Sequence, residues 1–311
     1  MKTKNKKDSI KYWDEHARDW EKMAYDKEKK YLKFPTSQQR QDITINEIEK
    51  LASTKKVSIV DLGCANGELV RTLLKKGFIN VKGIDNSKKM TEVAKKILKK
   101  EIPHIDPNKI FFVDDVNYLN KNEIFDFVTA MGLIEYLINI DAFFKKLYHL
   151  LNRGGYAFIE SRNKLFNLFS ANKYTYKSPT RELVEELEDI KVFSPIKDEK
   201  EIEDIIIKTF ISIGKNLENI KLSKEDKRIE KFDRFPFELP QATPKEIEIL
   251  CKKHNLKLRY VVYYHPHPFL PKFENNFPTI FNRISLPMQP LGYTPLGATI
   301  CSAFIAIIQK P

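Results

Sequence analysis

Between residues 57 and 160, short apolar runs alternate with segments whose apolar side chains recur at helical spacing. The apolar runs at 57–61, 81–85, 110–113, 125–130 and 156–160 predict strands, and the segments between them predict helices. Such alternation is typical of a parallel sheet with helices on both faces. In sheets of this kind ligands bind beyond the carboxyl ends of the strands, so the residues that follow each strand are the first candidates for a functional site.

The strand–helix pattern stops after residue 163 and resumes near residue 241. The intervening part predicts helices without strands, including one at 181–190 and a longer one at 199–217. Beyond it, a helix from 243 to 254 and strands at 258–264 and 299–308 are predicted. We therefore expect an α/β fold with a seven-stranded, mainly parallel sheet.

Composition narrows the class of protein. Hydrophobic residues make up 42% of the 311 residues, enough for a large core, which excludes general disorder. Lysine and arginine total 54 against 42 acidic residues, a net charge of +12. Arginine, which makes planar bidentate contacts to bases and phosphates, is scarce relative to lysine. We interpret the charge mainly as a solvated surface and expect no nucleic-acid partner; an acidic or phosphate-bearing partner is the alternative.

The spacing of the cysteines and the length of the apolar runs indicate the cellular compartment of the protein. Cys64, Cys251 and Cys301 lie far apart and form neither a metal-binding pattern nor a disulfide framework. No signal-peptide-like segment precedes Trp13, and the longest nearly apolar run, 298–308, is shorter than the ~20 residues of a membrane-spanning helix. We therefore expect a soluble, cytoplasmic protein.

The turn after the first predicted strand carries the clearest chemical signal, Asp61-Leu62-Gly63-Cys64-Ala65-Asn66-Gly67. Small residues there allow a ligand to lie against the backbone, and the following helix offers free N–H groups. Asp85 ends the second strand and can accept hydrogen bonds from two ribose hydroxyls. Asp114, Asp115 and Val116 follow the third strand, where they can bond an exocyclic amine and a ring nitrogen. Together these residues predict a pocket for an adenosine group.

This arrangement resembles the class I S-adenosylmethionine-dependent methyltransferases, whose first motif is D/E-x-G-x-G-x-G. Asp85 and Asp115 fall where the ribose-binding and adenine-binding acids of that family fall, with Asp114 as an alternative adenine contact. Segments 125–128 and 132–137 resemble the fourth motif, and 151–156 resembles the turn into the fifth strand. The opening segment 12–20 is similar to the helix that closes over the cofactor in small-molecule methyltransferases. One departure is Ala65, which replaces the middle glycine.

The resemblance implies a Rossmann-like fold, S-adenosylmethionine as cofactor and methyl transfer as the reaction. Tyr12 and Trp13 could instead pack a helix, and Met131 and Tyr136 could line the pocket or pack within the core. The residues that the resemblance and the strand-end positions predict to bind the cofactor are Tyr12, Trp13, Asp61, Gly63, Cys64, Ala65, Gly67, Asp85, Asn86, Met90, Asp114, Asp115, Val116, Met131 and Tyr136.

We expect three regions along the chain. Residues 1–163 form the cofactor-binding core with an N-terminal helical cap, and residues 164–240 form a helical insertion that acts as a lid over the acceptor. Residues 241–311 complete the core and include a proline-rich acceptor loop at 266–296. The aromatic side chains of this loop need burial, so we expect it to be ordered.

Candidate catalytic groups follow the later strands. A hydroxyl acceptor must lose a proton, which calls for a histidine or a carboxylate within hydrogen-bond reach. Glu160 ends the fifth strand, and His265 and His267 follow the sixth; each histidine could be a base or a structural residue. Two histidines two residues apart could also bind a metal. Because the flanking prolines favour a rigid turn and no third ligand is evident, we expect no metal.

The segment after the fifth strand mixes amides, hydroxyls and aromatic rings. It resembles segments in methyltransferases of bacterial surface-glycan and secondary-metabolite pathways, and its candidate acceptor-binding residues are Arg162, Asn163, Asn172 and Tyr174. We expect O-methylation of a sugar or glycan-type hydroxyl, with C- or N-methylation of a quinone-like or secondary-metabolite small molecule as the alternative. A cofactor-binding protein without catalysis and an RNA methyltransferase are further alternatives. The aromatic 266–296 segment could contact a membrane surface. The oligomeric state is not predicted.

Overall fold

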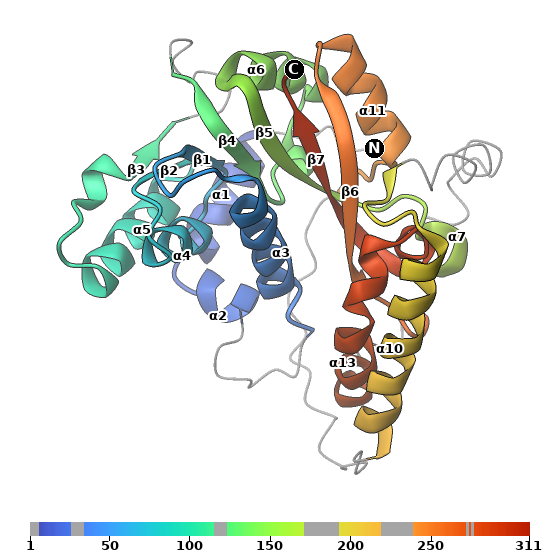
Figure 1. Cartoon of the computed structure of the whole chain (residues 1–311). Helices are drawn as coiled ribbons and strands as arrows, with labels where there is room; N and C mark the ends of the chain where they lie inside the picture. The colour runs from blue at the N-terminus through green and yellow to red at the C-terminus, as the bar shows by residue number, and fades with distance from the viewer. Residues whose placement is uncertain are drawn as a thin grey trace.

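The computed structural model describes residues 6–25, 34–114, 123–170, 193–218, 239–271, 274 and 277–311. Their centre is a seven-stranded sheet in the order β3-β2-β1-β4-β5-β7-β6 (Figure 1). β7 is antiparallel to β5 and β6, and the other neighbouring strands are parallel. The predicted Rossmann-like, mainly parallel sheet is confirmed. The strands are β1 (Ser58–Leu62), β2 (Asn80–Asp85), β3 (Phe111–Val113), β4 (Phe125–Ala130), β5 (Leu151–Arg162), β6 (Lys257–Pro266) and β7 (Cys301–Gln309).

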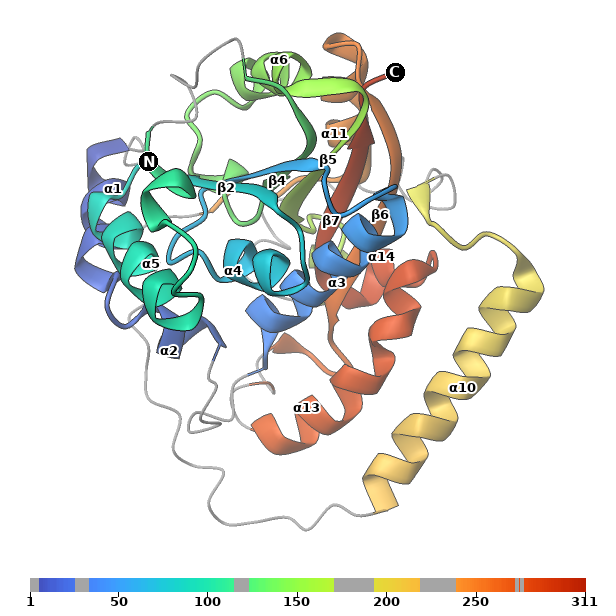
Figure 2. The ribbon, with the colours of Figure 1, turned by 60° about the vertical axis from the view of Figure 1, so that its left-hand side comes forward.

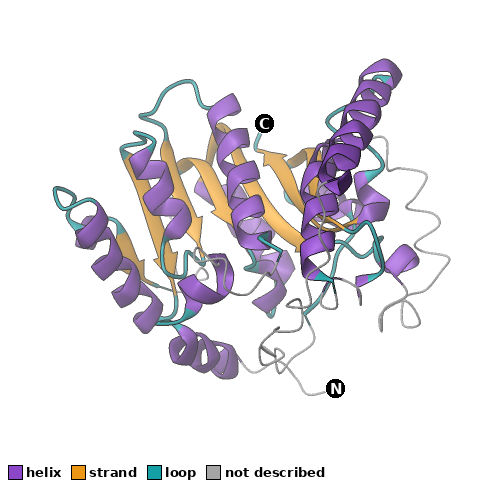
Figure 3. Cartoon of the chain, turned by 90° about the horizontal axis from the view of Figure 1, so that it is seen from below, coloured by secondary structure: helices purple, strands orange, loops and turns teal. Residues whose placement is uncertain are grey.

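Helices cover both faces of the sheet and bury it in two separate clusters. Ile59 of β1 packs in the cluster that includes α3 (Thr36–Leu51), α4 (Glu68–Lys75) and α5 (Lys88–Glu101). Its neighbour Val60 packs in the cluster that includes α6 (Ile140–Leu150) and α11 (Pro244–Lys253). Successive side chains of a strand point to opposite faces, so strands buried on both sides read as continuous apolar runs. Figure 3 shows helices packed along this row of strands.

The remaining described helices lie at the edges of the sheet or connect its strands. α1 (Lys6–His16) and α2 (Trp20–Tyr25) precede the sheet, and η1 (Pro107–Lys109) and η2 (Ile134–Tyr136) are short 3₁₀ turns next to β3 and β4. α7 (Asn167–Ser170) follows β5. None of the helices within the described ranges combines the length and apolar character needed to cross a membrane.

β5 differs from its prediction at its start. It begins at Leu151, so Gly154 and Gly155 lie within the strand, where the pairing with β4 shifts register between Phe125 and Phe127. A Cβ on Gly155 would lie 2.9 Å from the carbonyl oxygen of Asp126. The two glycines therefore mark a close approach of two strands rather than a turn into the fifth strand.

The proline-rich segment is helical, which corrects the expectation of a loop. It contains α13 (Pro278–Ser285) and η3 (Leu286–Tyr293), and α14 (Gly297–Ile300) leads into β7. Pro278 and Pro287 occupy the first turns of their helices, where a missing N–H costs little. Phe281 is fully buried, as expected, whereas Phe269 and Phe277 are exposed, so the expectation that the aromatic side chains of this segment are buried is only partly correct.

The insertion contributes α10 (Glu199–Glu218), close to the predicted 199–217 helix. α10 packs against η3 and α13, and Figures 1 and 2 show it beside α13, beyond the carboxyl edge of the sheet. The predicted helix at 181–190 lies outside the described residues. The lid role of these helices stays a prediction.

Candidate functional site

The turn from β1 to α4 has the backbone shape that its small residues predict. Gly63 and Gly67 have φ angles of +72° and +76°, and Ala65 has a φ of +47°. A Cβ at Gly67 would lie 2.4 Å from the ring of Phe111, so only glycine fits there. Ala65 tolerates the left-handed conformation, and its backbone N–H donates to Oδ2 of Asp85 at 2.8 Å.

Asp85 joins this turn to the start of α5. Its Oδ1 accepts a hydrogen bond from the backbone N–H of Ser87 at 2.8 Å, and its side chain is buried. Burial raises the pKa of Asp85, while the N–H donors of Ser87 and Ala65 act in the opposite direction. Asn66 is buried beside the turn, and among the described residues its Nδ2 has no hydrogen-bond partner. The Asp85 carboxylate can accept hydrogen bonds from ribose hydroxyls, and the amide of Asn66 offers a donor beside it. This glycine-rich turn can therefore hold an adenosine group.

The N-terminal helix α1 spans the ends of two strands. Oδ1 of Asp14 accepts hydrogen bonds from Oγ of Ser87 at 2.6 Å and from the backbone N–H of Lys89 at 3.3 Å, beyond β2. The ring of Trp13 meets the ring of Tyr136, beyond β4, edge to face with 5.6 Å between centroids. These contacts hold α1 against the start of α5 and against η2, which follow the two strands on either side of β1.

Four of the other predicted cofactor residues lie in or next to the turns that follow β1 and β2. Asp61 is buried and its Oδ1 accepts from Oγ1 of Thr129 at 2.7 Å; burial raises the pKa of Asp61 to about 7. The thiol of Cys64 and the side chain of Met90 are buried, whereas Asn86 is exposed at the same edge.

Of the rest of this set, Asp114 and Met131 follow β3 and β4, and Tyr12 lies in α1. The backbone N–H of Asp114 donates to the carbonyl oxygen of Asp85 at 3.1 Å, which ties the two strand ends together. Oγ1 of Thr44 donates to Sδ of Met131 at 3.3 Å, and the ring of Tyr12 stacks on His16. Asp115 and Val116 lie outside the described residues.

A network of two buried carboxylates and two arginines, of which Arg162 is partly exposed, lies at the ends of β4 and β5. Arg40 of α3 donates through Nη1 to Oε2 of Glu160 at 2.6 Å, and the hydroxyl of Tyr264 donates to Oε1 of the same carboxylate. Arg162 donates through Nε to Oε2 of Glu135 at 3.4 Å. Burial raises the pKa of Glu135 to about 7, against the opposing effect of Arg162. Glu160, predicted as catalytic, is thus held in an ion pair. Glu135 at the end of β4 and Asp61 in β1 are both carboxylates with a pKa raised to about 7, which suits proton transfer near neutral pH.

Sequence reasoning did not single out Glu135, Arg40 or Tyr264. Glu135 could have been found, because it follows the fourth strand within a segment that resembles a family motif. Arg40 lies 120 residues from Glu160 and carries no local pattern that indicates the contact.

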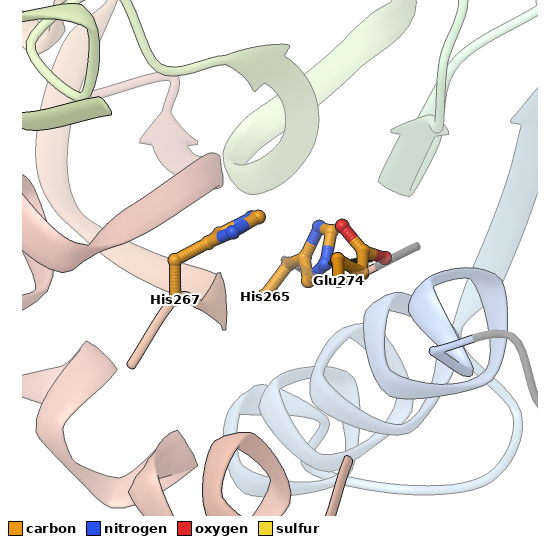
Figure 4. A group of neighbouring side chains, drawn as sticks. All are labelled: His265, His267 and Glu274. Carbon is orange, nitrogen blue, oxygen red and sulfur yellow. Dashed lines mark ion pairs between the residues drawn. The ribbon is translucent and has the colours of Figure 1, made fainter. Parts of the chain in front are cut away.

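The two histidines lie at the end of β6 with a third polar residue (Figure 4). Nε2 of His265 is 3.4 Å from Oε1 of Glu274, and Nδ1 of His265 is 2.8 Å from Oγ of Ser302. The ring centroid of His267 is 4.4 Å from that of His265, and burial lowers the pKa of His267 to about 3. Glu274 is the third candidate metal ligand that was not evident in the sequence, which removes one reason for expecting no metal.

The two histidines lie far from the end of β4, because two strands separate β6 from β4 in the sheet. β5 and β7 lie between β4 and β6, so the two strand ends are ~14 Å apart at the usual spacing of neighbouring strands. Their predicted role as bases is untested, and Glu135 lies closer to the end of β4.

The predicted acceptor-binding residues do not form one cluster among the described residues. Arg162 contacts Glu135, as described above. Asn163 is buried, and its Nδ2 donates to the carbonyl oxygens of Ala298 and Cys301, both at 2.8 Å, so it anchors the start of β7. This geometry gives no support to an acceptor contact by Asn163. Asn172 and Tyr174 lie outside the described residues.

Comparison with known proteins gives consistent matches. A family model described as a methyltransferase domain matches residues 20–196, more than half of the chain. Over 110 residues the chain is 36% identical to the ubiquinone biosynthesis O-methyltransferase of Pelagibacter ubique, which covers 35% of this chain and 44% of that protein. The protein of the same name from Coxiella burnetii is 26% identical over 164 residues, or 52% of this chain and 65% of that protein. The matches therefore span about half to two thirds of the length of these curated relatives.

Solved structures agree on the fold. Magnesium protoporphyrin IX methyltransferase from Synechocystis PCC 6803, crystallised with bound SAH, superposes with a TM-score of 0.53 and 12% identity, covering 98% of this chain and 99% of that one. An S-adenosylmethionine-dependent methyltransferase from Clostridium acetobutylicum gives a TM-score of 0.50 and 14% identity, covering 96% and 98%. Because the sheet order, the glycine turn with Asp85 and the family match all agree, the chain belongs to the class I S-adenosylmethionine-dependent methyltransferases.

Proposed function

We propose that this protein uses S-adenosylmethionine to methylate a phenolic hydroxyl of a small molecule related to quinones. The observation that carries the proposal is Glu135, a buried carboxylate with a pKa of about 7 at the end of β4. A phenolic hydroxyl must lose its proton when its oxygen accepts a methyl group, and a base with a pKa near the working pH is suited to take it.

Three residues at neighbouring strand ends would hold the adenosine group. Asp85 ends β2, and Asp114 and Gly63 follow β3 and β1, its neighbours in the sheet. β4 is the neighbour of β1 on the other side, so an acceptor beside Glu135 would be next to this part of the sheet. S-adenosylmethionine supplies a methyl group already activated on a sulfonium, so the protein mainly has to align the acceptor and exclude water.

The charged residues around Glu135 support its role as the base. Arg162 contacts the Glu135 carboxylate from one side, and the Arg40–Glu160 ion pair lies next to it. Arg162 can stabilise Glu135 in the ionised form that accepts the proton, while burial keeps the pKa from falling to its ordinary value. The same guanidinium is partly exposed and can face an acceptor oxygen.

The names of the relatives favour the phenolic acceptor over the sugar acceptor expected from the sequence. Both curated relatives are called ubiquinone biosynthesis O-methyltransferases, and a quinone methoxy group arises from a phenolic hydroxyl. This supports the quinone-like acceptor of the alternative hypothesis, with oxygen as the methylated atom rather than carbon or nitrogen. The glycan acceptor has no comparable support.

The proposal can be tested with radiolabelled S-adenosylmethionine and three acceptor panels: dihydroxylated phenols with and without an apolar tail, sugars and nucleotide sugars, and aromatic or aliphatic amines. We expect label in the phenol panel, in a product whose mass rises by one methyl group on oxygen. Robust labelling of sugars or amines with unlabelled phenols would contradict it. A Glu135→Gln variant, which keeps the shape of the side chain, should lose most of the phenol activity while it retains cofactor binding.

A further inference from the structure

His265, His267 and Glu274 form a compact group outside the cofactor site. One ligand-type atom from each residue lies within 4.8 Å of the other two, and Figure 4 shows the ring of His265 between His267 and the Glu274 carboxylate. His265 and His267 come from the end of β6, whereas Glu274 comes from the segment that leads to α13. The group therefore joins the sheet to the helices that extend beyond its carboxyl edge.

His267 is the residue that most clearly requires an explanation. Its side chain is 9% exposed, and neither Nδ1 nor Nε2 has a hydrogen-bond partner within the described part of the chain. Its ring contacts the rings of Phe166 and Phe281 as well as His265. Buried polar groups in proteins are nearly always partnered, and a buried imidazole that faces a second histidine and a carboxylate commonly binds a metal.

One spacing within the group matches that around a small cation, and the ligand atom of His267 lies within 4.8 Å of the other two. Tetrahedral zinc with bonds of about 2.0–2.1 Å to nitrogen and oxygen places its ligand atoms about 3.4 Å apart. Nε2 of His265 and Oε1 of Glu274 are 3.4 Å apart, which is long for a hydrogen bond between them. Nδ1 of His265 lies 2.8 Å from Oγ of Ser302, the second contact that typically orients a metal-binding imidazole.

From this geometry we propose that His265, His267 and Glu274 bind a divalent transition-metal cation, with zinc as the best match to two nitrogens and one carboxylate oxygen. Two histidines and one carboxylate leave at least one coordination position for water or another oxygen ligand. Bound there, the cation fastens the segment that carries Glu274 to the end of β6. The test of this site is independent of the proposed methyl transfer, because it uses neither the cofactor nor an acceptor.

The experiment uses the full-length protein stripped of metal with a chelator and then titrated with Zn²⁺ in competition with a chromophoric chelator, and separately with Co²⁺. We expect one equivalent of either ion to bind, with Co²⁺ absorption bands of a low-coordinate nitrogen–oxygen site. His267→Gln and Glu274→Gln should each weaken binding on the order of 100-fold, because each removes a ligand. Zinc should also raise the melting temperature of the unaltered protein and leave that of Glu274→Gln unchanged.

Two other histidines provide matched controls. His149 is exposed, and Nε2 of His254 lies 3.0 Å from Oδ1 of Asp141, so it represents a histidine–carboxylate pair without a second histidine. His149→Gln and His254→Gln should leave zinc binding unchanged. Circular dichroism of every variant without metal establishes that it is folded. The proposal is wrong if no stoichiometric binding occurs, if folded Glu274→Gln binds as tightly as the unaltered protein, or if the control variants lose affinity to the same extent.

Discussion

Among single residues, Asp85 combines two structural contacts with the predicted ribose contact. Each of its oxygens accepts one backbone N–H, from Ala65 and from Ser87. Asp85→Asn would place an NH₂ group against one of these donors, so the substitution breaks a hydrogen bond even though the shape is kept. Loss of a hydrogen bond to a charged group costs about 1.5–3 kcal/mol, so we expect S-adenosylhomocysteine to bind about 10- to 100-fold more weakly.

Calorimetric titration with S-adenosylhomocysteine measures this effect of Asp85→Asn. Asp106→Asn is the matched control, because Oδ1 of Asp106 accepts the N–H of Asn108, a contact that an asparagine oxygen can also make. Unchanged affinity in Asp85→Asn would show that the adenosine group does not depend on this carboxylate.

The raised pKa of Glu135 predicts how the rate of the reaction depends on pH. A base works in its ionised form, so kcat/KM should rise through a pKa of about 7 and fall about tenfold per pH unit below it. Glu135→Gln should remove this dependence and lower the rate by about 10²- to 10⁴-fold. Because the pKa of Asp61 is also raised to about 7, Asp61→Asn serves as the control and should retain the rise. A pH profile that disappears in Asp61→Asn and persists in Glu135→Gln would contradict this assignment.

Residues of the cofactor turn could be predicted from sequence because their contacts are set by local spacing. Gly63 and Gly67 adopt the left-handed backbone that a tight strand-to-helix turn requires, and Asp85 follows at the end of the next strand. Glu274 could not be predicted as a partner of His265, because nothing within either segment indicates which residues the chain brings together.

At the scale of elements, helix boundaries followed capping signals. Thr243 begins α11 with a capping box: its hydroxyl accepts the N–H of Glu246, and the Glu246 carboxylate accepts the N–H of Thr243. Pro244 occupies the first turn, as the sequence predicted. The start of β5 was predicted less accurately. Residues 151–155 lie where the pairing with β4 shifts register, and this shift depends on the position of β4.

Thr243→Ala should destabilise the protein by about 0.5–2 kcal/mol, because the N–H of Glu246 loses its acceptor at the start of a helix that packs on the sheet. Urea unfolding monitored by circular dichroism measures the loss as a lower midpoint at constant slope. Thr243→Ser keeps the hydroxyl and should recover most of the difference. Equal midpoints for the alanine and serine variants would mean that the cap contributes little.

Across the whole molecule, α1 links the start of α5 to η2, which follows β4. Asp14 contacts Ser87 and Lys89, and Trp13 contacts Tyr136, so ordering of α1 and binding of the cofactor should favour one another. Docking of this helix depends on contacts between segments more than 70 residues apart in the chain.

Asp14→Ala should therefore weaken S-adenosylhomocysteine binding by several-fold, about the effect of one or two hydrogen bonds. Amide hydrogen exchange should increase in residues 6–16 and stay unchanged in β1 and β4. Glu15→Ala, on the exposed side of α1, is the control and should change neither quantity. If Asp14→Ala alters neither affinity nor exchange, α1 does not close over the cofactor.

The sequence by itself determined the class of fold and the cofactor turn, because both depend on short-range periodicity and on backbone shapes that only a few residue types adopt. It also indicated the chemistry, since acidic residues after successive strands match one kind of ligand. Only the tertiary structure decided which polar groups meet at the later strand ends: Arg40 with Glu160, Arg162 with Glu135, and Glu274 with His265. Such pairs form between distant segments, and no local pattern in the sequence indicates them. The same packing raises the pKa of Glu135 and leaves His267, among the described residues, without a hydrogen-bond partner.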